Sequence, residues 1–290
     1  MIEGIIVNTL VRGGVYALLA VGFSLIFGVA RVLNLAHTAF YMLAAYGIFT
    51  FAKILGLDPI SSIFLSILVT TLIGLLTYKL FIDRVREHQV TVMLLTLALA
   101  MVFQEAMLLA FGGHYLSAPS FVSGYWQIIG VKVAYQHLLI LGVALVVLLA
   151  MWALLSKTKL GIAIRATAQD TEIANLMGIN VSTILLTVMG IATALAAVAG
   201  VVVAPTLILE PHMLWPPFVM VMAIITLGGL GSVKGSIVGA FILAFVEVLV
   251  VFLLPTGAFL KGAFALLAMV IVLVVRPEGL FGIAFEEERL

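Results

Sequence analysis

Long apolar runs, separated by short polar or glycine-containing breaks, fill almost the whole of this 290-residue chain. A bilayer core of about 30 Å is crossed by roughly 20 helical residues. In lipid, a helix satisfies its own backbone hydrogen bonds. We therefore expect an all-α, polytopic transmembrane helical bundle of about eight or nine spans in a single domain over residues 1–290. The expected spans lie near residues 5–29, 37–53, 60–79, 92–111, 138–155, 185–207, 217–230, 236–254 and 259–275.

The composition excludes several classes of protein. The chain is 64% hydrophobic and 9% charged, whereas a typical soluble domain is roughly 45–50% apolar and about 25% charged. A soluble globular enzyme and a disordered tail are thereby excluded. The net charge of +1 provides no basic field for a nucleic acid. With no cysteine and five scattered histidines, we expect neither a metal site nor a cofactor.

Basic residues indicate the orientation in the membrane, because loops on the cytoplasmic side are enriched in lysine and arginine. Placing the C-terminus in the cytoplasm and alternating the spans leaves Lys53, Lys132 and Lys261 in outer loops. The larger group of lysine and arginine residues then falls in inner loops: Arg31, Lys79, Arg84, Arg86, Lys157, Lys159, Arg165, Lys234, Arg276 and Arg289. We therefore expect a cytoplasmic C-terminus, and an odd number of spans would leave the N-terminus outside.

Glycines cluster in two similar places. One cluster lies in residues 13–28 and the other in residues 228–239, and in each an apolar run ends in a short turn with one basic residue, Arg31 or Lys234. Such glycines are typical of closely packed or broken membrane helices. The pattern fits an internal repeat and equally fits two ordinary helical hairpins.

The most polar inner stretch, at about residues 156–184, predicts a short helix. Asp170 or Thr171 can cap its start and Gly178 can close it. Ile173, Leu176 and Met177 share one face at i, i+3 and i+4 spacing. Such an apolar face suits either a groove on a partner protein or the lipid surface, and the residues alone leave both open.

Three stretches of the chain resemble the LivH/LivM-type permeases, the membrane subunits of ABC importers for branched-chain amino acids and related solutes. They are GVYALLAVGFSLIFGVARVLNLAHTAFYMLAAYG (14–47), GIAIRATAQDTEIANLMGIN (161–180) and TLGGLGSVKGSIVGAF (226–241). The resemblance extends from about residue 5 to residue 282 and is closest to the LivH branch. One departure is Thr38, which stands where the family commonly has a glycine.

The resemblance implies a transport subunit rather than an enzyme, in the inner (cytoplasmic) membrane. It implies a second permease subunit (homologous or identical), two cytoplasmic ABC ATPase subunits, a periplasmic or extracellular solute-binding protein, membrane lipid and a small amino-acid-like solute as partners. The loop helix becomes a coupling helix that docks on the ATPase. The residues assigned to this role are Gly161, Arg165, Ala166, Gln169, Asp170, Glu172, Ile173, Leu176, Met177 and Gly178.

Polar side chains in or beside the spans are candidates for the translocation path: Asn34, His37, Gln104, Glu105 and Glu247. A charge near the middle of the bilayer costs at least ~2.5–3.5 kcal/mol, so Arg12, Glu105 and Glu247 are expected to face a bundle interior or a cavity. Hydrogen bonding or ion pairing between helices is favoured over solute contact for these groups.

An ion-gradient-driven secondary transporter or channel is the alternative function. It would need a buried carboxylate that binds protons or sodium, and Glu105 and Glu247 are the candidates. A membrane-embedded enzyme has little support, because the chain contains no H-E-x-x-H or G-x-S-x-G motif.

Overall fold

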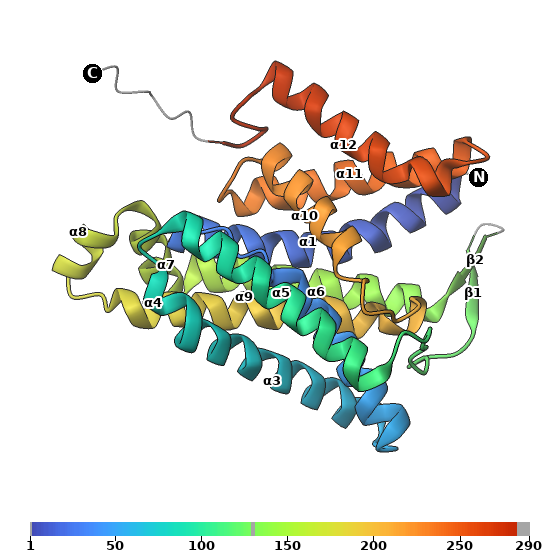
Figure 1. Cartoon of the computed structure of the whole chain (residues 1–290). Coiled ribbons are helices and arrows are strands. Elements are labelled where there is room, and N and C mark those ends of the chain that lie inside the picture. The colour runs from blue at the N-terminus through green and yellow to red at the C-terminus, as the bar shows by residue number, and fades with distance from the viewer. Residues whose placement is uncertain (1, 129–130, 283–290) are drawn as a thin grey trace.

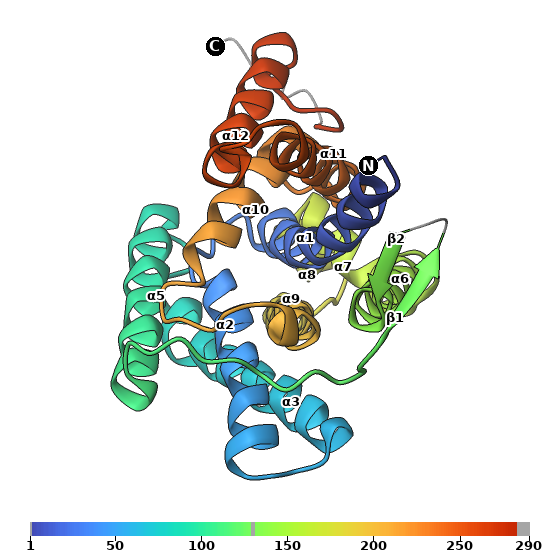
Figure 2. The same cartoon turned by 90° about the vertical axis from the view of Figure 1, so that its right-hand side faces the viewer.

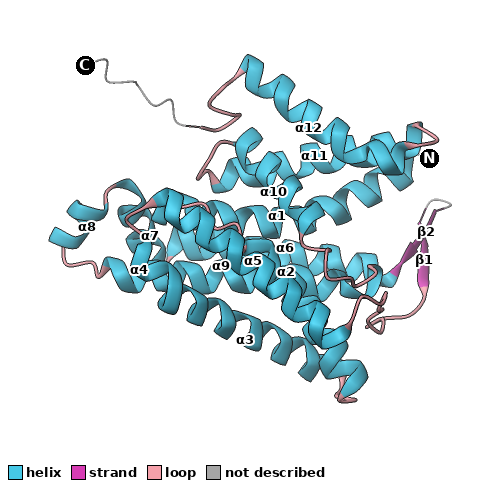
Figure 3. Ribbon diagram, in the orientation of Figure 1, coloured by secondary structure: helices cyan, strands magenta, loops and turns pink. Residues whose placement is uncertain are grey.

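Helices run through nearly all of the computed structural model, which describes residues 2–128 and 131–282 (Figure 1, Figure 3). In chain order the elements are α1 (Ile2–Ala30), α2 (His37–Ile48), η1 (Phe49–Ile54), α3 (Pro59–Thr77), η2 (Tyr78–Ile82), α4 (Asp83–Val85), α5 (Gln89–Phe111), β1 (Tyr125–Ile128), β2 (Val131–Ala134), α6 (Tyr135–Lys157), α7 (Lys159–Gln169), α8 (Thr171–Leu176), α9 (Val181–Val203), η3 (Ala204–Thr206), α10 (Trp215–Gly228), α11 (Val233–Leu253) and α12 (Gly257–Val275). The expected polytopic helical bundle is confirmed.

Among the described residues, 7 helices are long and apolar enough to cross a membrane. They are α1, α3 with its continuation to Val85, α5, α6, α9 with η3, α11 and α12. Two further apolar runs are also helical but shorter. One is α2, which continues into the π-helical turns of η1, and the other is the 14-residue α10.

The two ends of the bundle differ in charge. Figure 1 shows α4, α7 and α8 at one end, and the β-hairpin with the start of α1 at the other. The basic residues predicted for inner loops lie in or beside elements at the α8 end, whereas Lys53, Lys132 and Lys261, together with Arg12 of α1, belong to the hairpin half. Arg289 lies outside the described residues. The basic side chains are therefore segregated along the long axis of the bundle.

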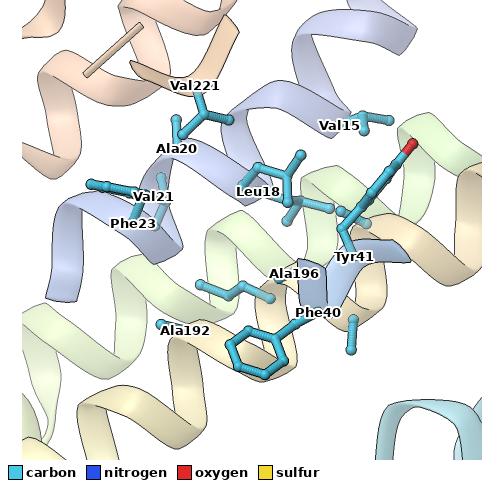
Figure 4. Packing of buried hydrophobic residues seen from close by; sticks show 14 of the residues in the cluster. Val15, Leu18, Ala20, Val21, Phe23, Phe40, Tyr41, Ala192, Ala196 and Val221 are labelled. Carbon is cyan, nitrogen blue, oxygen red and sulfur yellow. The ribbon is translucent and has the colours of Figure 1, made fainter. Parts of the chain in front are cut away.

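The core is built around α1, which packs against α9 and α11 and carries fully buried side chains such as Leu18 and Ala20 (Figure 4). Figure 4 shows Phe23 of α1, Phe40 of α2 and Ala196 of α9 in the same cluster. Figure 2, which looks along the bundle, shows α3, α5, α6 and α12 around this centre. The helices with the most exposed surface therefore surround the helices with the least.

Small residues let the central helices approach closely. A Cβ at Gly200 of α9 would overlap the carbonyl oxygen of Tyr41 in α2, so only glycine fits there. On α3, the buried Ser66 Oγ donates a 2.6 Å hydrogen bond to the carbonyl oxygen of Ala44 in α2. Such contacts stabilise helix association in lipid, where burial of apolar side chains supplies little driving force.

The structure differs from the all-helical expectation in the loop before α6. β1 and β2 pair antiparallel, with Tyr125 opposite Ala134 and Trp126 opposite Val133. Aromatic and β-branched residues favour strands, but a single hairpin pair is too short to stand out from an irregular loop in the sequence.

Replacing Gly200 by alanine tests the close packing of α9 on α2. The added Cβ meets backbone rather than a movable side chain, so we expect the free energy of unfolding to fall by about 1–3 kcal/mol. Gly142→Ala in α6 is the matched control, because nothing lies within 4 Å of a Cβ at that position. Thermal unfolding of the purified protein in detergent measures both. Equal effects of the two substitutions would contradict this account.

Candidate functional site

Two short helices, α7 and α8, fill the loop between α6 and α9. Thr158 caps α7, since its Oγ1 accepts a hydrogen bond from the N–H of Gly161 at 3.0 Å. Asp170 caps α8: its Oδ1 accepts hydrogen bonds from the N–H groups of Glu172 at 2.8 Å and Ile173 at 2.9 Å. Each cap satisfies donors that the first turn of a helix leaves without partners. Of the two caps that the sequence allowed, Asp170 is the one used.

Two glycines fix the path of this loop. A Cβ at Gly161 would overlap the carbonyl oxygens of Leu154 and Leu155, so α7 can fold back on the end of α6 only with glycine there. Gly178 follows α8 with φ of +84°, a conformation that L side chains rarely adopt. The short helix predicted to end at Gly178 is thereby confirmed.

The apolar face predicted for the loop helix is exposed. The exposed fractions are 59% for Ile173, 86% for Leu176 and 79% for Met177, whereas Ala174 is buried. The other residues assigned to coupling surround this face or precede it: Arg165, Gln169, Asp170 and Glu172 are exposed, and Ala166 is half-buried. The loop therefore presents a small apolar surface at its tip, with charged and amide side chains nearby.

A surface cleft of about 530 Å³ lies beside α8. Its lining includes Glu172 and Asn175 from the loop and Arg86 from the turn after α4. Arg86 also lies near Asp83, with Nη1 and Oδ1 separated by 3.6 Å. Sequence reasoning did not assign Arg86 to this site, because its only visible signal was a basic charge on an inner turn.

The three stretches that resemble the LivH/LivM family meet at this end of the bundle. Arg31, just after α1, donates a hydrogen bond from Nη2 to the carbonyl oxygen of Gln169 at 3.4 Å. Near the same end of α1, a Cβ on Gly28 would lie only 3.1 Å from the carbonyl oxygen of Gly231, in the turn between α10 and α11. The end of α1 therefore contacts both the loop helices and the second glycine cluster.

Glu247 is the centre of a charge cluster near the opposite end. It is 2% exposed, and its Oε1 lies 2.5 Å from Arg12 Nη1 and 3.1 Å from Lys261 Nζ. Tyr16 donates a 2.8 Å hydrogen bond to its Oε2. The cluster joins α1, α11 and α12, and it compensates a carboxylate that would be costly to bury alone.

Asn34 and His37 are buried where the chain turns from α1 into α2. His37 Nε2 lies 3.1 Å from the carbonyl oxygen of Leu19, and Asn34 Nδ2 lies 3.6 Å from Met189 Sδ on α9. Thr38, the departure from the family pattern, is fully buried beside them. These side chains connect neighbouring helices, and at 0–1% exposure His37 and Asn34 reach no open surface.

Gln104 and Glu105 are neighbours on α5 but face different ways. Gln104 is buried, and its Oε1 accepts a 2.6 Å hydrogen bond from the indole N–H of Trp215 at the start of α10. Its Nε2 donates to Glu105 Oε1 at 3.2 Å, whereas Glu105 itself is exposed. The structure therefore does not bring Glu105 together with Glu247 and Arg12.

The comparison with known protein families identifies the chain. Residues 5–273 match the family described as branched-chain amino acid transport system / permease component. The chain belongs to this family. It is a multi-pass membrane permease and not an enzyme.

Relatives of this permease cover nearly its whole length. It is 28% identical over 292 residues to the high-affinity branched-chain amino acid transport permease BraD of Pseudomonas aeruginosa, covering 96% of this chain and 94% of BraD. It is 27% identical over 290 residues to LivH of Escherichia coli, covering 95% and 94%. The solved structure of PsaBC from Streptococcus pneumoniae in complex with Fab has a similar fold, with a TM-score of 0.53, 15% identity and 95% of both chains covered.

Most of the polar side chains predicted to lie along the path make contacts between helices. Within residues 2–128 and 131–282, no group of three or more histidine, aspartate or glutamate side chains could hold a metal ion. Of the five path candidates, the three that are almost fully buried, Asn34, His37 and Glu247, contact neighbouring helices. Only Glu105 lies on an exposed face.

Replacing Glu247 by glutamine tests the charge cluster. The substitution leaves Arg12 and Lys261 without their carboxylate, so we expect the free energy of unfolding to fall by about 1–3 kcal/mol. Transport in the assembled system should stay within several-fold of normal. Thermal unfolding and solute uptake into vesicles measure the two effects.

Two controls accompany Glu247→Gln. Glu87→Gln changes an exposed carboxylate and should leave stability unchanged. Arg12→Met combined with Glu247→Gln should recover part of the lost stability, because fewer uncompensated charges remain. A folded Glu247→Gln variant whose transport has lost its pH dependence would contradict a structural role for this carboxylate.

Proposed function

We propose that this permease is a translocation subunit of an ABC importer for branched-chain or related amino acids, or similar small polar solutes. The single observation that carries the proposal is the exposed apolar tip of α8 at the basic end of the bundle. An apolar face held outside a membrane bundle is suited to a groove on a partner protein. The named relatives, BraD and LivH, belong to high-affinity branched-chain amino acid transport systems.

We assign the α8 end to the cytoplasm of the inner (cytoplasmic) membrane. The segregation of lysine and arginine at that end supports this orientation. On this proposal the permease crosses the membrane about eight or nine times, with α2–η1 and α10 as short or tilted spans. With nine spans, the start of α1 lies outside and the C-terminus inside. The whole chain forms one permease domain with a coupling loop at about residues 156–184.

In this proposal the coupling helix docks on one of two cytoplasmic ATPase subunits. Ile173, Leu176 and Met177 form its apolar contact, and the exposed side chains of Arg165, Gln169, Asp170 and Glu172 form polar contacts around it. Gly161, Ala166 and Gly178 shape the loop. ATP binding would bring the ATPase subunits together and displace α8. The contact of Gln169 with Arg31 supports transmission of that movement to α1.

A second permease, homologous or identical, completes the translocation path, and a periplasmic or extracellular binding protein delivers the solute. For Asn34, His37 and Glu247 we propose that they hold helices together beside the path, as their burial and contacts support. Glu105 lies on the exposed side of α5, which we place next to the path, and the buried Gln104 lies behind it. The two glycine clusters are consistent with an internal repeat and equally with two ordinary helical hairpins.

An ion-gradient-driven carrier is the second candidate function. Its best candidate for proton or sodium binding, Glu247, already has two cationic partners, which disfavours a role as an ion site. Uptake into vesicles distinguishes the two functions. The ABC proposal requires ATPase subunits for uptake, whereas a secondary carrier would move solute with a gradient alone.

Leu176→Asp tests the coupling helix directly. Burying a side chain of this size is worth about 1.5–3 kcal/mol, and the variant also places a charge in the docking groove. We expect the permease to insert normally, because α8 lies outside the membrane. Co-purification of the ATPase should fail, or ATP hydrolysis should no longer depend on the solute-loaded binding protein.

Two variants of the same helix control for general effects. Leu176→Met keeps an apolar anchor and should retain the ATPase. Asn175→Asp adds a charge at the neighbouring position and should weaken docking less than Leu176→Asp. If Leu176→Asp keeps both ATPase binding and coupled hydrolysis, α8 rests on lipid and the coupling assignment is wrong.

A further inference from the structure

Two cations share one buried carboxylate where α1, α11 and α12 meet. Glu247 Oε1 lies 2.5 Å from Arg12 Nη1 and 3.1 Å from Lys261 Nζ. No other carboxylate in the described part of the chain lies within 4.0 Å of either cation. Figure 2 shows α11, α12 and the start of α1 together at one edge of the bundle. With all three groups ionised, one positive charge is in excess at this edge.

Both cations have donors to spare. An arginine side chain has five N–H donors and a lysine ammonium has three. Among the described residues, Arg12 donates one side-chain hydrogen bond, to Glu247. The side chains of Arg12 and Lys261 are 39% and 40% exposed, whereas that of Glu247 is 2% exposed. The carboxylate therefore lies beneath the surface, and the unused donors lie at it.

The cluster lies close to the ends of the helices that carry it. Glu247 comes six residues, about 9 Å, before the end of α11, and Lys261 comes four residues, about 6 Å, after the start of α12. The 21 residues of α11 extend about 31 Å, which is close to the thickness of the hydrocarbon core. Long basic side chains extend from such positions toward the lipid headgroups. Arg12 and Lys261 can therefore reach the level of the lipid phosphates.

The exposed surface near the two cations is apolar. Phe252 and Leu253 at the end of α11 are exposed, and so is Ile6 on α1. Phe259, two residues before Lys261, is 92% exposed. Acyl chains suit such a surface, whereas the rim of a contact with a water-soluble protein is polar. The surroundings therefore favour lipid as the neighbour of the cations.

Other lysines of the hairpin half are placed differently. Lys53 and Lys132 each lie over an aromatic ring, with the ammonium 5.3 Å and 4.9 Å from the ring centre. They belong to η1 and β2, outside the long apolar helices, where water completes their solvation. Arg12 and Lys261 lie within long apolar helices, where an anion must balance the excess charge.

We propose that Arg12 and Lys261 bind the phosphate of an anionic phospholipid in the leaflet at the hairpin end. The phosphodiester carries one negative charge, which balances the one positive charge in excess, and its oxygens accept hydrogen bonds from the unused donors. A zwitterionic phospholipid has the same phosphate but also an ammonium group, which the cluster repels. The site therefore selects a headgroup without an amine, and the bound lipid connects α12 with α1 above Glu247.

Native mass spectrometry of the full chain tests the preference. Permease released from nanodiscs with equal amounts of phosphatidylglycerol and phosphatidylethanolamine should retain mainly phosphatidylglycerol. Inorganic phosphate in millimolar excess should not displace it, because free phosphate has no acyl chains to bind the apolar surface. Equal retention of the two lipids, or displacement by inorganic phosphate, would overturn the proposal.

Variants of Lys261 test the site itself. Lys261→Met removes the excess charge and leaves Glu247 with Arg12 and Tyr16, so the affinity for phosphatidylglycerol should fall about fivefold or more. Lys261→Arg should retain the lipid. Lys132→Met lowers the net charge of the chain by the same amount and should leave retention unchanged. A folded Lys261→Met variant that retains phosphatidylglycerol as the unaltered chain does would contradict the assignment.

Photo-crosslinking locates the lipid while the cluster stays intact, so it decides the proposal even if Lys261→Met does not fold. In vesicles of the same two lipids, a photoreactive residue at Phe259 should label phosphatidylglycerol in preference to phosphatidylethanolamine. The same residue at Leu72 on α3, exposed to 50%, should label both equally. Adducts with protein at Phe259, or equal labelling of the two lipids there, would show that no anionic lipid is selected at this site.

Discussion

Close approach between helix backbones is the constraint on which the rest of this permease depends. Inside lipid, helices gain little from burying apolar side chains, so van der Waals packing at small residues must hold them together. Gly200 lies against the backbone of Tyr41, and Gly28 lies against Gly231. Gly28 belongs to α1, which packs against α9 and α11 at the centre of the bundle and whose two ends make different contacts. One end joins the Glu247 cluster through Arg12, and the other reaches Gln169 through Arg31.

The buried charge cluster follows from that central position. Little of α12 is buried, and it packs on α11 and α10 at the edge of the bundle. Lys261 connects α12 to Glu247 on α11, and Arg12 connects the same carboxylate to α1. Because three helices depend on one carboxylate, the cluster favours a single arrangement of this side of the bundle. Both oxygens of this carboxylate are already engaged, Oε1 by Arg12 and Lys261 and Oε2 by Tyr16.

The sequence could predict the helices but not their faces. Apolar runs and the caps around Asp170 and Gly178 are local signals, and the structure has helices at the expected places. In α5, however, residues on all sides are apolar, so nothing local separates the buried Ala100 from the exposed Val102. The pairing of Arg12 with Glu247 joins residues 235 positions apart, which no spacing rule reveals. The β-hairpin was missed because its strands are too short to show an alternating pattern.

The loop formed by α7 and α8 combines a fixed shape with an exposed apolar tip, and these properties usually conflict. An isolated helix as short as α8 is unstable in water, and burial of its apolar face would normally stabilise it. Here the cap at Asp170 and a hydrogen bond from the Ile179 N–H to the Ala174 carbonyl oxygen hold both ends of the helix. Ala174 supplies the inward contact, so Leu176 and Met177 are free to contact a partner. For the docking proposed above, a tip ordered before binding loses less conformational entropy than a flexible one would.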